Sequence, residues 1–172
     1  MRVPLLAMWL GASLLACGAP GAPTAAPATQ ATFIGRSEGC SDFQMARASA
    51  DARRFLVVSV SRKLLGLATG TIHTYALGPS LPGVSVHVDV FPKPLTGETP
   101  YCNDVGGQST APVRWSARRG SVIIALKART DGREGYYASV RLANLELVSP
   151  SGQVLVVAEE AILDQQVGWY PG

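Results

Sequence analysis

The alternation of valine with polar residues over residues 84–90 is the feature that most constrains the fold. The segment reads Val-Ser-Val-His-Val-Asp-Val, so every second side chain is apolar. Successive side chains of a β-strand point to opposite faces of its sheet. The pattern therefore predicts a strand with one face in the core and the other in solvent.

A period of two recurs along most of the chain, with turns rich in Gly, Pro and Ser between the segments. Further strands are predicted over residues 43–47, 55–60, 71–77, 113–117, 122–126, 137–147 and 153–158. The continuous apolar runs Phe55 to Val60 and Val122 to Leu126 predict strands that are covered on both faces. Residues 159–167 fit either one or two helical turns or a last strand. About eight short strands predict an all-β fold, an antiparallel β-sandwich of immunoglobulin-like or related architecture.

The first 31 residues differ in composition from the rest. A basic start at Met1-Arg2 and an apolar stretch to Ala16 have the layout of a secretory signal peptide, and the stretch is too short to span a membrane. Residues 18–31 carry no charge and no large apolar side chain, which predicts a disordered tether. The division is therefore a signal peptide over 1–16, a tether over 17–31 and one β-sandwich domain over 32–172.

The run Leu14-Leu15-Ala16-Cys17 resembles the lipobox of bacterial lipoproteins. The resemblance implies that the Cys17 thiol is joined to a diacylglycerol, that Met1 to Ala16 is removed, and that Cys17 becomes the lipidated N-terminus. It also implies a protein of the cell envelope, held by this lipid on the extracytoplasmic side of a membrane. Gly18 rather than Asp follows the cysteine, which implies the outer membrane in a Gram-negative cell. The alternative is an ordinary signal peptide, cut at another small residue nearby.

Two cysteines remain once Cys17 is assigned to lipid. Such a pair can become oxidised in an exported protein, so Cys40 and Cys102 are predicted to form a disulfide. The alternative is a redox or metal pair, but neither cysteine lies in a C-x-x-C motif or near a histidine.

The charge pattern predicts no nucleic-acid partner. Fifteen basic and twelve acidic side chains give a net charge of +3, and the basic ones form small groups rather than a dense stripe with interleaved aromatics. A protein or glycan of the envelope is the expected partner, and no cofactor is predicted.

Two sets of residues are candidate sites. His73, His87 and Asp89 fall on two strands around one turn, so they could hold Zn²⁺ or Cu²⁺ if these strands pair in the right register. Otherwise both histidines are wet-face or partly buried residues that bond to their neighbours. Glu98, Asn103 and Asp104 lie in the long segment from Phe91 to Pro112, which is a candidate binding surface.

These observations favour a non-enzymatic, lipid-anchored envelope protein that recognises a protein, peptide or glycan. The alternative is a metal-binding or small-ligand module that uses His73, His87 and Asp89. A hydrolase with an unrecognised site is less favoured than either of these. Gly35-Arg-Ser-Glu-Gly39 satisfies the G-x-S-x-G pattern, but the nucleophile elbow needs a strand, a sharp turn and a helix in a parallel sheet.

Overall fold

The computed structural model describes residues 28–78, 81–96, 100–103 and 111–168. These residues form nine strands and a one-turn helix: β1 (Thr29–Gln30), β2 (Ser37–Cys40), β3 (Gln44–Ala48), β4 (Arg54–Val60), α1 (Arg62–Leu65), β5 (Ile72–Leu77), β6 (Val84–Val90), β7 (Val113–Ala128), β8 (Tyr136–Val148) and β9 (Val154–Val167). No helix in the described ranges has the length and apolar character needed to cross a membrane. The predicted signal peptide and Cys17 lie outside the described residues.

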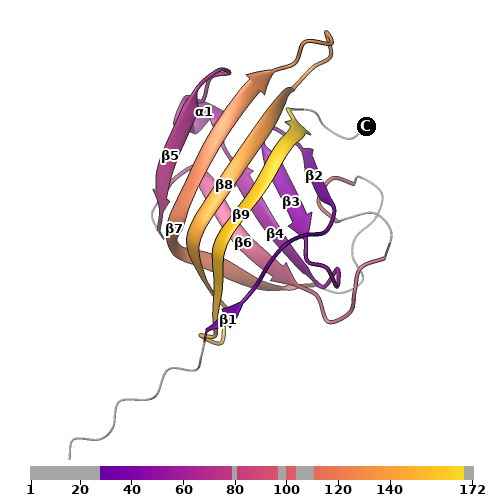
Figure 1. The fold of residues 1–172 in the computed structure, drawn as a ribbon, viewed down its shortest axis with the longest axis vertical. Coiled ribbons are helices and arrows are strands. Elements are labelled where there is room, and N and C mark those ends of the chain that lie inside the picture. Colours follow the sequence, from indigo (N-terminus) through magenta and orange to yellow (C-terminus); the bar gives the residue numbers. More distant parts are fainter. Residues whose placement is uncertain (1–27, 79–80, 97–99, 104–110, 169–172) are drawn as a thin grey trace, which may run out of the picture.

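All nine strands belong to one strongly curled sheet (Figure 1). The strand order is β1-β9-β8-β7-β6-β4-β3-β2, and β5 pairs with β7 beside this path. β1 runs parallel to β9, and every other pair is antiparallel. The all-β prediction is thus confirmed, whereas a sandwich of two antiparallel sheets of immunoglobulin type is not.

The difference from the predicted sandwich arises in the long strands. The two strands predicted over 113–117 and 122–126 are one strand, β7, and residues 153–158 continue without a break into 159–167 as β9. Such long strands bend instead of ending, so one sheet wraps around the core in place of two sheets that face each other.

Gly120 marks the bend of β7. The register between β7 and β8 shifts on either side of Arg119, as it does at β-bulges, which bend and twist a strand. Gly120 has a φ of 136°, and a Cβ on it would lie 2.7 Å from a methyl carbon of Leu145. Both the backbone angle and the close approach require glycine at this position.

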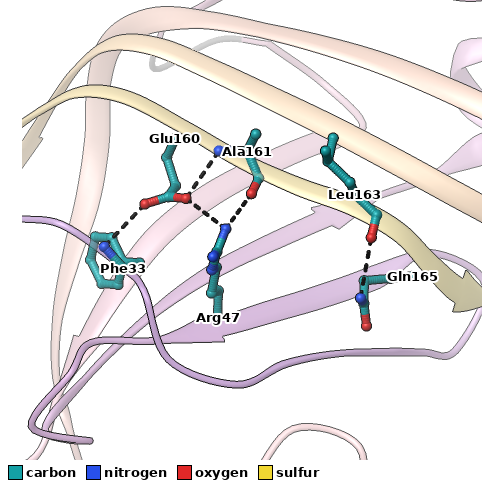
Figure 2. A network of polar contacts seen from close by, with 6 residues as sticks. All are labelled: Phe33, Arg47, Glu160, Ala161, Leu163 and Gln165. Atoms are coloured by element: carbon teal, nitrogen blue, oxygen red, sulfur yellow. Dashed lines mark hydrogen bonds and ion pairs between the residues drawn. The ribbon is translucent and has the colours of Figure 1, made fainter.

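The curl brings β2 against the C-terminal half of β9, where the two strands lie side by side in Figure 1. A Cβ on Gly39 would lie 2.5 Å from the carbonyl oxygen of Gln166, and the Gly168 amide donates to the Ser41 carbonyl at 2.6 Å. Figure 2 shows the ion pair nearby, in which Arg47 of β3 donates to Glu160 of β9 at 2.9 Å. These contacts hold the curled sheet closed.

The main core fills the inside of the curl. Its fully buried members come from β3, β4, β6 to β9 and the segment between β1 and β2. The largest are Phe33, Met45, Leu56, Ile124, Leu142, Leu145, Leu147 and Ile162. The apolar run of β4 is covered on both faces as predicted, whereas Ile123 of β7 is 37% exposed, so the same prediction for Val122 to Leu126 was wrong.

The folded part begins before the predicted end of the tether. Thr29 and Gln30 pair with Leu155 and Val156 of β9, and Ala31 is buried in the main core. An uncharged, small-residue segment can therefore be ordered when the edge of a sheet supplies partners for its backbone.

Candidate functional site

The predicted disulfide joins Cys40, the last residue of β2, to Cys102, with a Cα–Cα distance of 5.6 Å. It fastens the end of the segment made by residues 91–96 and 100–103, here called the outer loop, to the outside of the curled sheet. Gln44 of β3 donates to the carbonyl oxygen of Tyr101 at 3.2 Å, and the Leu95 amide donates to Ala52 at 2.9 Å.

The outer loop covers a second, smaller hydrophobic cluster. Phe91, Leu95 and Tyr101 pack over the outward side chains of β3 and β4, which are Ala46, Ala48, Phe55 and Val57. The Phe55 ring lies 5.7 Å from the Phe91 ring, edge to face, and 5.7 Å from the Tyr101 ring. The outer face of the sheet is therefore shielded from solvent beside β6. The alternation of valine with polar residues over 84–90, taken alone, predicts a solvent-exposed face there.

Asp89 is a buried carboxylate at the border of this cluster, and its residue is 1% exposed. It lies between Phe55 and Arg114 in the cross-strand row. Arg114 donates to both carboxylate oxygens, from Nε at 2.8 Å and from Nη2 at 2.9 Å, and the Tyr101 hydroxyl donates at 2.9 Å. This bidentate, three-bond arrangement compensates the buried charge.

Opposing effects act on the pKa of Asp89. Burial alone would raise the pKa, but the neighbouring His87, Arg114 and Tyr101 outweigh it and hold the pKa of this carboxyl well below its usual range. Burial, followed by the charge of Asp89, raises the pKa of the Tyr101 hydroxyl. Asp89 therefore stays ionised and Tyr101 stays a neutral donor at physiological pH.

His87 is the neighbour of Asp89 on the same face and is 7% exposed. Neither of its ring nitrogens has a hydrogen-bond partner among the described residues. The closest charged atom is Oδ2 of Asp89, 3.6 Å from Nε2, which is beyond hydrogen-bond distance. A buried imidazole without partners is unusual and calls for an explanation.

A cleft of about 350 Å³ opens beside His87. It lies where β5 and β6, both partners of β7, diverge: β6 pairs with residues 113–116 and β5 with residues 120–125. Leu77, Leu81 and Val86 contribute apolar walls, and His87, Arg114 and Ser116 contribute polar ones. The cleft therefore combines apolar surface with a few polar groups, as small-molecule sites do.

The structure does not bring together the three residues of the predicted metal site. β5 and β6 do not pair with each other; His73 lies opposite Ile124 of β7, and His87 lies opposite Ser116. His73 instead contacts Thr71 at 2.9 Å and stacks on Tyr75. His87 and Asp89 remain together, but in the described ranges no three His, Cys, Asp or Glu side chains are grouped as metal ligands.

The predicted binding loop is only partly described. Glu98 and Asp104 lie outside the described residues, and Asn103 directly follows the disulfide at Cys102. Recognition of an envelope protein or glycan by this loop stays a prediction.

Ser37 of the G-x-S-x-G pattern begins β2, and strand β3 follows that strand, with no helix between them. Both glycines instead allow close packing, since a Cβ on Gly35 would lie 2.8 Å from the Ala48 carbonyl oxygen. The motif therefore serves the closure of the sheet, and it forms no nucleophile elbow.

A larger cleft of about 510 Å³ lies at the bend of β7, between Arg119, Asn144 and Glu146. Its buried carboxylate, Glu146, already forms ion pairs with Arg118 and Arg119. The cleft beside His87 is the stronger candidate, because there a buried imidazole has no hydrogen-bond partner in the described part of the chain.

The comparisons with protein-family models, curated proteins and solved structures found no match to this chain. The candidate site is therefore argued from the geometry of the structure alone.

Sequence reasoning missed Arg114, Tyr101 and Ser116, because only strand pairing and the fold of the outer loop place them next to Asp89 and His87. One signal was present: a carboxylate in a valine-rich strand needs a cation if it is buried.

Proposed function

We propose that the protein is a lipid-anchored, extracytoplasmic binding protein of the cell envelope, which holds a small molecule in the cleft beside His87. The observation that carries the proposal is the buried imidazole of His87, which lines the cleft and whose two nitrogens have no hydrogen-bond partner among the residues that the structure describes. A ligand in the cleft would give these nitrogens a partner and recover the free energy that their burial costs.

The chemistry around the cleft supports binding rather than acid or base catalysis. A general base works best when its pKa lies near the operating pH. Asp89, the carboxylate beside His87, has a lowered pKa and already accepts from Arg114 and Tyr101. It orients donors and holds no proton to transfer.

The cleft is tested by filling it. Ser116 is exposed on the strand that lines the cleft, so Ser116→Trp should block it without loss of the fold. The control is Thr74→Trp, which introduces the same large side chain at an exposed position of β5 that does not line the cleft. Full-length proteins in detergent are exposed to a small-molecule extract of the cell envelope, and bound molecules are identified by mass spectrometry. We expect wild type and Thr74→Trp to retain a compound that Ser116→Trp does not. The same retained compounds in all three proteins, or none in any, would refute binding at the cleft.

The anchor is tested at Cys17. Wild-type protein should sediment with membranes after a high-salt wash, and its N-terminal peptide should carry the mass of the attached acyl chains. Cys17→Ala should lose both properties, whereas a Cys40→Ala/Cys102→Ala protein should keep them. Equal membrane retention of Cys17→Ala and wild type would exclude the lipid as the anchor.

A further inference from the structure

We propose that the ligand of the cleft is a monocarboxylate with a short apolar tail, bound through Arg114 and His87. This inference rests on the proposed function and adds the chemical class of the ligand.

Arg114 has hydrogen-bond donors to spare. A guanidinium carries five N–H groups, and Asp89 takes one from Nε and one from Nη2. The Arg114 side chain is 57% exposed and lines the cleft, and the described part of the chain supplies no other acceptor for it. Arg114 and His87 both line the cleft, so the remaining N–H groups of Arg114 and a ring N–H of His87 can donate to an oxyanion there.

The donors of Arg114 are fixed before a ligand arrives. Asp89 holds the guanidinium through two bonds, and the Tyr101 hydroxyl holds the carboxylate of Asp89 in turn. Tyr101 directly precedes Cys102, which the disulfide fastens to β2. Preorganised donors cost little conformational entropy on binding, which favours a specific site over a general positive surface.

The charge of the site selects a monoanion. Asp89 neutralises most of the Arg114 charge, so the pair offers directed donors but little net positive charge. A dianionic phosphate requires more cationic groups than this site contains. A carboxylate carries one charge and matches the few donors present. Leu77, Leu81 and Val86 line the same cleft, where they would cover a short apolar tail.

Isothermal titration of the full-length protein in detergent with hexanoate, hexanamide and hexyl phosphate tests the inference. We expect hexanoate to bind at least tenfold more tightly than either other probe, because only hexanoate presents a single negative charge to Arg114 and His87. His87→Phe keeps an aromatic ring but removes both nitrogens, and should weaken hexanoate binding about tenfold. The exposed Ser116→Trp blocks the cleft and should abolish binding, which keeps the test valid if His87→Phe does not fold.

Each contrary outcome has a distinct meaning. If hexanamide or hexyl phosphate binds as tightly as hexanoate, the monocarboxylate inference is wrong while binding in the cleft stands. If none of the probes binds, the inference is also wrong, and the envelope-extract experiment decides separately whether the cleft binds another class of molecule.

Discussion

Replacing Cys40 and Cys102 together by alanine should lower the free energy of unfolding by about 4 kcal/mol. The cysteines are 62 residues apart in the sequence, and a crosslink that closes a loop of this length removes about that much conformational entropy from the unfolded chain. Chemical denaturation of the full-length protein, with and without reductant, measures the effect. Reductant should destabilise wild type to near the level of the double variant and leave the double variant unchanged.

The loss should also be uneven across the fold. The disulfide fastens the outer loop, whose Tyr101 covers Phe55 and donates to Asp89. Amide hydrogen exchange should therefore rise most in β2 and the outer loop, and less in the long strands β7 and β8, which face the main core. Uniform changes in exchange, or a denaturation midpoint that reductant does not move, would contradict this account.

The individual strands were largely predictable because their signal is local. The alternation over 84–90 identified β6 residue for residue, and the runs over 55–60 and 71–77 identified β4 and β5 to within a residue. The way the strands assemble was not predictable. Whether residues 113–117 and 122–126 form two strands or one bent strand depends on the close packing of Gly120 against Leu145, which the sequence does not reveal.

The candidate site shows the same limit. His87 and Asp89 were correctly placed on one face of one strand, since two residues of a strand separated by one share a face. The sequence pattern could not show that His73 lies apart from His87 and Asp89. A turn between two strands permits a hairpin as well as the observed arrangement, in which β5 and β6 each pair with β7. The cysteine pair was predictable because the assignment of Cys17 to a predicted lipid anchor left only two candidates.

Asp89→Asn should lower the free energy of unfolding by about 2–3 kcal/mol at neutral pH. The substitution keeps the shape of the side chain but removes its charge, and it turns an amide donor toward Arg114 or Tyr101, which are donors themselves. Breaking a fully buried ion pair costs 3–5 kcal/mol or so, and the smaller figure here allows for the 57% exposure of the Arg114 side chain, which water can solvate.

The matched control is Asp42→Asn, which makes the same chemical change in the long, 3.6 Å ion pair with Arg62, where the Asp42 side chain is 47% exposed. Both side chains of this pair reach solvent, so its loss should change stability little. Thermal and urea denaturation of both variants give the comparison. Equal losses at the two positions would show that burial of Asp89 adds nothing, and would contradict the prediction.

The pH dependence gives a second, independent readout of the same carboxylate. The folded state lowers the pKa of Asp89 below the ordinary carboxyl value of about 3.9, so the folded protein binds this proton less readily than the unfolded chain does. The stabilisation is therefore complete above about pH 5, and falls as the pH drops through 4 toward the lowered pKa. Wild type should lose stability over this window more steeply than Asp89→Asn, which has no carboxyl to protonate there. The difference between the two proteins should shrink as the pH falls from 5 to 3, because over this range the unfolded wild-type chain takes up a proton on Asp89 that the folded state, with its lowered pKa, does not bind.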